Sequence, residues 1–197
     1  MVNFLHMLNI LVVAIFMIGY LPQVYTTIKC KQHKGVSTSF WYYVAVSTSI
    51  TLHNMIVTGE AEWYMYMGQI VNALFAVIFF VYFNHMRNKH YKARYIAFVA
   101  AYLLVTPMAT NLLDVSHSQI VASVAIVAAY VSQLKHFYIN KTSEGTNPLL
   151  YGLFATGILV LILVLLLTGA STHVIITESI NVGLLLVCYV AAVIYKK

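Results

Sequence analysis

Long apolar runs separated by short polar breaks dominate the pattern of hydrophobic and polar positions along the chain. The apolar core of a bilayer is about 30 Å thick, so a helix that crosses it needs roughly 20 apolar residues. The runs therefore predict seven membrane-spanning helices, at residues 4–28, 38–58, 64–86, 94–113, 117–138, 147–168 and 174–195. The fourth run is the most interrupted, by Thr106, Pro107, Thr110 and Asn111.

The composition agrees with this pattern. Hydrophobic residues make up 61% of the 197 residues and charged residues only 8%, and the mean hydropathy is +0.84. A soluble domain of this size cannot bury so much apolar surface in one core. We therefore expect an all-α membrane protein whose helices contact the lipid bilayer.

The basic residues predict the orientation in the membrane. With seven spans, every lysine and arginine falls on one side, namely Lys29, Lys31, Lys34, Arg87, Lys89, Lys92, Arg94, Lys135, Lys141, Lys196 and Lys197. The opposite loops contain Glu60, Glu62 and Asp114. The positive-inside rule then places the N-terminus outside and the C-terminus in the cytoplasm. The net charge of +6 thus reflects topology, and we expect no nucleic-acid partner. The short loops favour a bacterial plasma membrane.

The chain resembles itself when it is shifted by 110 residues, and such a period bears on the whole fold. The shift sets Tyr20-Leu21-Pro22-Gln23 over Tyr130-Val131-Ser132-Gln133, Gly35 over Gly145, and Thr58-Gly59 over Thr168-Gly169. After one deletion in a loop, Asn72 meets Asn181. These matches predict two parallel three-helix repeats, residues 1–88 and 116–197, joined by a linker helix within residues 89–115.

The motifs in the first repeat resemble the PQ-loop family. They are the Pro22-Gln23 pair at the end of a first helix, a basic loop, and Gly35-x-Ser37 at the start of a second helix. The 3+1+3 arrangement looks most like the SWEET transporters, which are built from parallel repeats. The resemblance covers nearly the whole chain, although Ser132 stands where a second proline is usual. It implies a carrier that moves a small polar solute by alternating access, without a cofactor.

Pro22 predicts a kink in the first helix. Proline has no backbone N–H, so the carbonyl of Ile18 loses its helical partner. A free carbonyl in hydrocarbon costs several kcal/mol, and either the amide of Gln23 or a neighbouring helix can satisfy it. We expect a hinge here. The alternative is that Pro22 only ends a helix near the membrane interface.

The second repeat predicts a gentler bend at Ser132-Gln133. A serine hydroxyl can bond back to the carbonyl four residues earlier, here Ala128, and bend a helix slightly. The first helix is therefore expected to swing more than the fifth. Ser37 and Asn147-Pro148 are typical of helix N-caps.

Polar residues inside the spans are the candidate solute ligands, because they are costly in lipid and usually face a cavity. Asn72 and Asn181 occupy equivalent positions, and the SWEET resemblance implies that both bind substrate. Gln69 and Glu178 lie one turn outward. Glu178 can hold a proton, bind a cationic solute, or contact water at the start of its helix.

The second helix adds His53 and Asn54, where the family tends to place pocket residues. Trp41 and Trp63 lie near helix ends, as interfacial anchors do, and neither is placed to stack on a sugar. A sugar is the default substrate by resemblance, with an amino acid or a vitamin-like metabolite close behind. A ligand-binding receptor of the PQ-loop type, without net transport, is the alternative.

Other chemistries find little support in the sequence. It lacks a glycine-rich phosphate loop, paired catalytic carboxylates and a nucleophile elbow, so we do not expect an enzyme. Cys30-x-x-His33 is too sparse for a zinc site, and no metal is expected. A homo-oligomer is compatible with the sequence.

Overall fold

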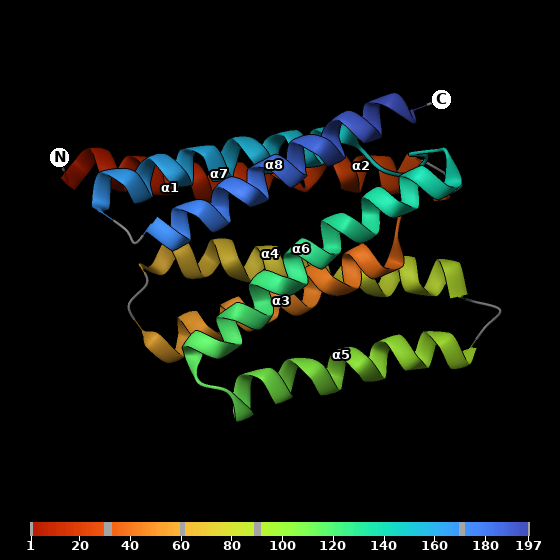
Figure 1. The fold of residues 1–197 in the computed structure, drawn as a ribbon, viewed down its shortest axis with the longest axis horizontal. Coiled ribbons are helices and arrows are strands. Elements are labelled where there is room, and N and C mark those ends of the chain that lie inside the picture. Colours follow the sequence, from red (N-terminus) through yellow and green to blue (C-terminus); the bar gives the residue numbers. More distant parts are fainter. Residues whose placement is uncertain (1, 30–32, 60–61, 89–91, 170–171, 197) are drawn as a thin grey trace. The chain divides into compact units, whose positions relative to one another are not determined.

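The computed structural model describes residues 2–29, 33–59, 62–88, 92–169 and 172–196. These residues form helices and loops and contain no strand. Cys30, Lys31, Glu60, Lys89 and Lys197, which belong to the patterns above, lie outside the described residues. The described helices are α1 (Val2–Gly19), α2 (Leu21–Lys29), α3 (Thr38–Thr58), α4 (Trp63–Asn88), α5 (Lys92–Leu112), α6 (Val115–Asn140), α7 (Pro148–Thr168) and α8 (Thr172–Ile194) (Figure 1).

Six of the predicted spans are long and apolar enough to cross a membrane. They lie at Phe4–Lys29, Trp63–Arg87, Ala93–Leu112, Val115–Asn140, Pro148–Thr168 and Val174–Ile194. Large apolar side chains such as Ile28, Leu104 and Leu166 are exposed along them. Such surfaces are stable only in lipid, so the environment of this protein is a lipid bilayer.

The predicted span at residues 38–58 forms a helix of 21 residues, α3, but it is not among the six. Its surroundings give the physical reason. Ten of its residues are buried within the protein, including polar Thr48 and Asn54. Its Ser49 hydroxyl lies 2.9 Å from that of Tyr102 on α5. A helix surrounded by other helices can carry polar groups that a lipid-facing helix cannot.

The helices pack as two compact units, one formed by Met1–Gly35 with Leu134–Lys197, and one by Val36–Gln133. We call them unit 1 and unit 2. In unit 1, the first helix of the predicted first repeat packs on α7, from the predicted second repeat. Compact packing and sequence repetition are different properties, so the predicted division into two repeats and a linker stays a prediction.

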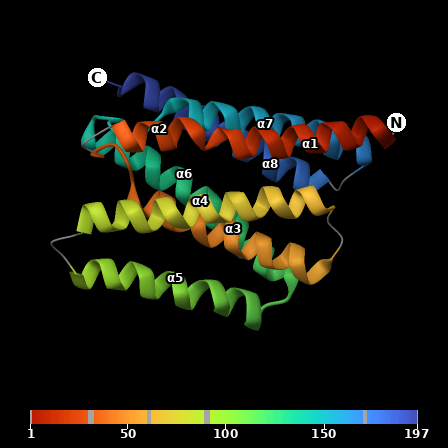
Figure 2. The ribbon, with the colours of Figure 1, turned by 180° about the vertical axis from the view of Figure 1, so that it is seen from behind.

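Unit 1 is held together by close contact of α1, α7 and α8, which lie side by side in Figure 1 and in Figure 2. Small residues allow this approach: a Cβ on Gly19 would overlap the ring of Phe154, and one on Gly157 would overlap Phe16. The rings of Phe16 and Phe154 meet edge to face at 5.7 Å. Small residues opposite large ones are how membrane helices pack without a hydrophobic driving force.

Described lysines of unit 1 gather toward one end of its helix bundle. α1 begins and α8 ends at opposite ends of this bundle in both views (Figure 1, Figure 2). Lys29 closes α2, and Lys141 and Lys196 follow α6 and α8. These lysines therefore lie toward one end of the unit. Which end faces the cytoplasm stays a prediction from the positive-inside rule.

Unit 2 has its core between α3 and its neighbours. Val46 and Ile50 of α3 pack against small residues, namely Ala109 of α5 and Ala122 and Ala125 of α6. Alanines on the facing helices let the backbones approach closely.

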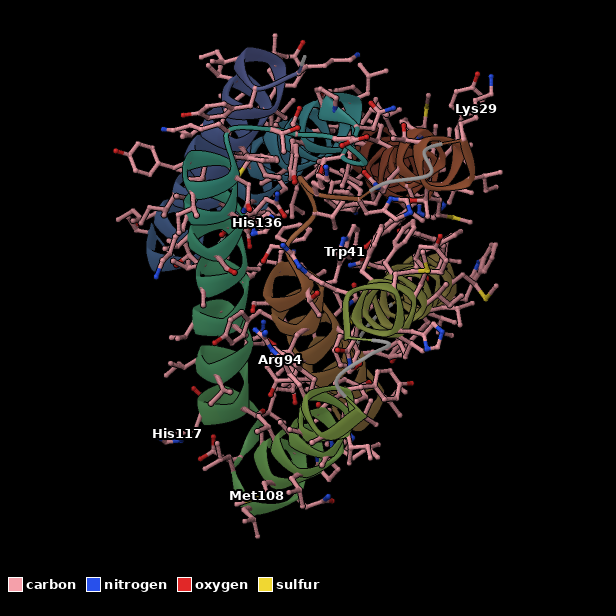
Figure 3. All side chains as sticks on the ribbon, turned by 90° about the vertical axis from the view of Figure 1, so that its right-hand side faces the viewer. Lys29, Trp41, Arg94, Met108, His117 and His136 are labelled. Carbon is pink, nitrogen blue, oxygen red and sulfur yellow. The ribbon has the colours of Figure 1, made fainter. Side chains whose placement is uncertain are left out.

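Trp41 is also part of the unit 2 core, since it is only 2% exposed. The centroid of its ring lies 4.5 Å from the ring centroid of Phe79 on α4. Figure 3 shows Trp41 between α3 and α4. The expectation of an interfacial anchor is therefore wrong for Trp41. Trp63, at the start of α4, is 73% exposed, as an anchor is.

Candidate functional site

The glutamine of the Pro22-Gln23 pair is fully buried in unit 1 and uses its amide on both sides. Its Oε1 accepts a hydrogen bond from the backbone N–H of Asn147 at 2.9 Å. Its Nε2 donates to the carbonyl of Gly145 at 2.8 Å and to the hydroxyl of Thr27 at 3.1 Å. Gln23 therefore joins α2 to the start of α7.

The side chain of Asn147 also forms hydrogen bonds to α2. It is the N-cap of α7, with its side chain accepting from the N–H of Leu149, and Pro148 follows at the first helical position. Its Nδ2 donates to the carbonyl of Pro22 at 3.0 Å and to the hydroxyl of Thr26 at 2.9 Å. The predicted N-cap is confirmed, and the pair Pro22-Gln23 and Asn147 forms one hydrogen-bonded cluster.

The first span is broken just before Pro22. α1 ends at Gly19 and α2 begins at Leu21, with Tyr20 in a turn between them. Tyr20 is fully buried, and its ring meets that of Phe154 at 4.9 Å. The helix is thus interrupted where the sequence predicted a kink. The suggestion that the Gln23 amide satisfies the carbonyl of Ile18 is wrong, because that amide donates to Gly145 and Thr27.

Unit 2 contains the matching glutamine, Gln133, which is 1% exposed. Its Oε1 accepts from the backbone N–H of Ser37 at 3.0 Å. Ser37 is the N-cap of α3, with its Oγ accepting from the N–H of Phe40. Gln133 therefore meets the start of α3 in the way that Gln23 meets the start of α7, and both contacts obey the 110-residue spacing.

The second motif differs in its helix, because α6 runs unbroken from Val115 to Asn140 through Ser132. The Ser132 hydroxyl lies 3.0 Å from the Ser37 hydroxyl, so it does not bond back to Ala128 as the sequence suggested. Ser132 and Gln133 therefore both contact Ser37, the N-cap residue of α3, through their side-chain oxygens.

The helix ends repeat as well. Gly59 ends α3 and Gly169 ends α7, both with left-handed backbone at φ 65° and 70°. Each donates its N–H to the carbonyl four residues earlier, Met55 and Leu165. Glycine is the residue that adopts this conformation without strain. These caps again lie 110 residues apart.

Two loops cross at the basic end of unit 1. The N–H of Gly35 donates to the carbonyl of Glu144 at 2.8 Å, and the hydroxyl of Thr146 donates to the carbonyl of Gly35 at 3.2 Å. A Cβ on Gly35 would overlap the backbone of Ser143. Burial lowers the pKa of the neighbouring His33 imidazole, and the charge of Glu144 offsets part of this effect. The loops that follow the two glutamine motifs are therefore fixed to each other.

Asn181 and Glu178 form a polar pair on α8 of unit 1. The Asn181 amide donates to the Glu178 carboxylate at 3.1 Å. Asn181 is only 7% exposed, and its Oδ1 has no hydrogen-bond partner among the described residues. A buried acceptor without a partner costs roughly 1–3 kcal/mol. This atom is therefore ready to accept a hydrogen bond from a hydroxyl or amide group.

Asn72 and Gln69 form the corresponding pair on α4 of unit 2. The Asn72 amide donates to Gln69 Oε1 over a long 3.4 Å, and Gln69 Nε2 donates to the carbonyl of Thr48 on α3 at 2.9 Å. Both side chains are half-buried. The local geometry of the two asparagine pairs is alike, since each asparagine donates to the side chain three residues before it.

The α3 candidates differ from each other. His53 is half-buried and makes no hydrogen bond to another described residue. Asn54 is 5% exposed and held at the start of α6, where its Oδ1 accepts from Ser118 at 2.9 Å and its Nδ2 donates to Gln119 at 3.1 Å. The hydrogen bonds of Asn54 therefore hold α3 against α6, whereas the imidazole of His53 can still form hydrogen bonds.

Sequence reasoning missed some buried polar residues. Asn84 is fully buried on α4 and donates to the carbonyl of Tyr95 on α5 at 3.2 Å. The intramembrane-polar criterion that selected Asn72 would also have selected Asn84. The partners of Gln23 were beyond the sequence, because Gly145 and Asn147 are more than 120 positions away.

These features define an all-helical membrane protein with two similar glutamine clusters and two asparagine pairs. Residues 4–64 match a family model described as the PQ loop repeat. This segment contains the Pro22-Gln23 pair, Gly35, Ser37 and α3, and it is less than half of the chain. Comparison with curated proteins and with solved structures gives no match.

Proposed function

We propose that this protein carries a small polar solute across the membrane by alternating access, with Asn72 and Asn181 binding the solute. The observation that carries the proposal is the buried Oδ1 of Asn181, which has no hydrogen-bond partner among the described residues. An acceptor in this state is costly unless a ligand or water bonds to it.

The solute class follows from the donor and acceptor groups. Asparagine offers two donors and one acceptor, which suits hydroxyl and amide groups. A sugar is the first candidate because of the SWEET resemblance. An amino acid or a vitamin-like metabolite is the second, because the Glu178 carboxylate beside Asn181 would attract a cationic group.

The interrupted first span supports a moving element. The break at Tyr20 separates α1 from α2, and hydrogen bonds from Gln23 join α2 to the start of α7. Residues at the ends of helices, such as Tyr20, are where hinges form in domain motions. We place the N-terminus outside and the C-terminus in the cytoplasm.

The test has two stages. A thermal-shift screen of the purified protein against sugars, amino acids and nucleosides identifies ligands, since a ligand of the folded state raises its apparent stability. Uptake of the best ligand into proteoliposomes down its gradient is then measured for the wild type, Asn72→Ala and Asn181→Ala. Ser179→Ala is the control, because Ser179 is exposed on α8 and, among the described residues, its hydroxyl bonds only to the carbonyl of Ile175 on the same helix.

Loss of uptake in both asparagine variants, with uptake retained in Ser179→Ala, supports the carrier. Uptake at the wild-type rate in both asparagine variants overturns it. Ligand binding by the wild type without any uptake would instead identify a receptor or sensor.

A further inference from the structure

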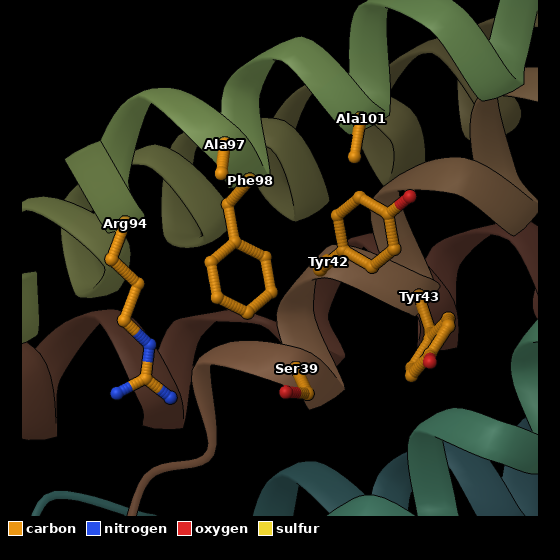
Figure 4. A pocket seen from close by; sticks show the side chains of 7 residues that line it. All are labelled: Ser39, Tyr42, Tyr43, Arg94, Ala97, Phe98 and Ala101. Carbon is orange, nitrogen blue, oxygen red and sulfur yellow. The ribbon is translucent and has the colours of Figure 1, made fainter.

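A groove between α3 and α5 of unit 2 lies apart from the asparagine pairs. Its volume is about 340 Å³, and it is lined by Ser39, Tyr42, Tyr43, Arg94, Ala97, Phe98 and Ala101. Figure 4 shows Arg94, Ala97 and Ala101 following one another along α5, with Ser39, Tyr42 and Tyr43 opposite on α3. Nothing in the proposed transport mechanism uses this groove.

One end of the groove is cationic. Arg94 lies in the first turn of α5, is exposed, and makes no hydrogen bond or ion pair with another described residue. Ser39 lies in the first turn of α3, where the positive end of the helix dipole favours an anion. Arg87 near the end of α4 donates to the carbonyl of Val36 at the same end of the unit. This end therefore favours a negatively charged group.

The remainder of the groove is apolar. The rings of Tyr42 and Phe98 meet edge to face at 5.7 Å, and Ala97 and Ala101 leave space beside them. α5 has only 6% of its most apolar stretch buried within the protein, so this wall borders the lipid. A cation at a helix end followed by an apolar wall along the membrane is complementary to a charged head followed by a hydrocarbon chain.

We propose that this groove binds one anionic phospholipid. Its phosphate lies between Arg94 and the start of α3, and one acyl chain lies along Tyr42, Phe98 and Ala101. Basic pockets between membrane helices bind lipid head groups in this way, and each basic residue near the surface adds to the attraction. The proposal rests on the groove alone and stands whether or not the protein is a carrier.

The test measures lipid binding by native mass spectrometry of the purified protein in detergent. Phosphatidylglycerol is added to the wild type, Arg94→Gln, Ala101→Trp and the control Lys135→Gln. Lys135 is an exposed lysine on α6 outside the groove, so its loss removes the same charge elsewhere. Phosphatidylcholine, with a zwitterionic head, and inorganic phosphate, with no chain, are added to the wild type in parallel.

We expect one tightly retained phosphatidylglycerol on the wild type and on Lys135→Gln. We expect about fivefold weaker retention on Arg94→Gln, which is the scale of one basic residue at a lipid surface. Ala101→Trp fills the apolar part and should weaken retention as well. If Ala101→Trp does not fold, Arg94→Gln decides the question alone, because the Arg94 side chain is exposed and its replacement leaves the core of the protein intact.

Three results would overturn the proposal. They are unchanged retention of phosphatidylglycerol by Arg94→Gln, equal retention of phosphatidylcholine by the wild type, and retention of inorganic phosphate by the wild type as tight as that of phosphatidylglycerol. The last would assign the cationic end to a soluble anion.

Discussion

The buried amide of Gln23 accepts a hydrogen bond from the backbone N–H of Asn147 at 2.9 Å, across 124 positions of sequence. Gln133 does the same for Ser37 at 3.0 Å. The first N–H groups of a helix have no partner within it. Each glutamine therefore supplies, from another helix, an acceptor that the start of α7 or α3 lacks.

Replacing Gln23 by leucine should lower the free energy of unfolding by about 1–3 kcal/mol, the cost of leaving buried polar groups unsatisfied. The groups concerned are the N–H of Asn147 and the carbonyl of Gly145. Thr27→Val is the control, since it removes only one part-buried bond to Gln23. Thermal unfolding in detergent measures both. Equal stability of the two variants would contradict the assigned role.

The break at Tyr20 predicts that the first span bends more than α6. Spin labels at Ile10 and Ile28 span the break, and labels at Ile120 and Tyr138 span the matching part of α6. All four side chains are exposed. A straight helix separates such pairs by about 27 Å along its axis.

We expect a narrow distance distribution near this length for the α6 pair. For the first pair we expect a broader distribution that shifts when a transported solute is added. Pro22→Ala should narrow the first distribution, because alanine restores the missing backbone donor. Distributions of equal width in the two pairs would show that Pro22 only marks a helix boundary.

Helix positions could be predicted from the sequence because the apolar runs are long and their caps are local. Ser37 and Asn147-Pro148 were recognised as N-caps without knowledge of any distant residue, and the structure confirms both. The break before Pro22 also follows from local chemistry. Trp41 was misplaced because its burial depends on Phe79 of α4, which no local pattern reveals.

The candidate site was predictable only in part. Repetition and polarity selected Asn72 and Asn181, but not the state of their hydrogen bonds. Asn54 and Asn181 look alike in sequence, as single asparagines within apolar runs. In the structure Asn54 has its partners on α6, while Asn181 Oδ1 has none among the described residues. This difference comes from tertiary packing.

The stability of the protein should depend on pH through His33. Its imidazole pKa is lowered from the usual 6.5, mainly by burial. Below about pH 6.5 the unfolded chain therefore binds a proton that the folded chain does not, so stability falls as the pH drops from 6.5 through the lowered pKa. In His33→Asn the unfolding temperature should therefore change less with pH than in the wild type. The range to measure is pH 7.5 to pH 5, which brackets the ordinary histidine pKa of about 6.5.

Glu144→Gln gives a second check on His33. The Glu144 charge raises the His33 pKa against the larger effect of burial, so its removal should lower that pKa further. The loss of stability on acidification should then continue to lower pH than in the wild type. An identical pH profile for the wild type and His33→Asn would assign the acid sensitivity to other groups.

Replacing Asn181 by leucine should separate stability from function. The substitution removes a buried acceptor that has no partner among the described residues, and such an atom costs roughly 1–3 kcal/mol. It also breaks the part-buried bond from the Asn181 amide to Glu178, so the gain is offset by the loss of one hydrogen bond. We therefore expect Asn181→Leu to unfold at the same temperature as the wild type or higher, and to lose solute uptake. Asn54→Leu is the matched control, because it breaks the bonds to Ser118 and Gln119 and should lower stability by about 1–3 kcal/mol. If Asn181→Leu unfolds as readily as Asn54→Leu, then Asn181 stabilises the fold, and its unsatisfied oxygen is not reserved for a solute.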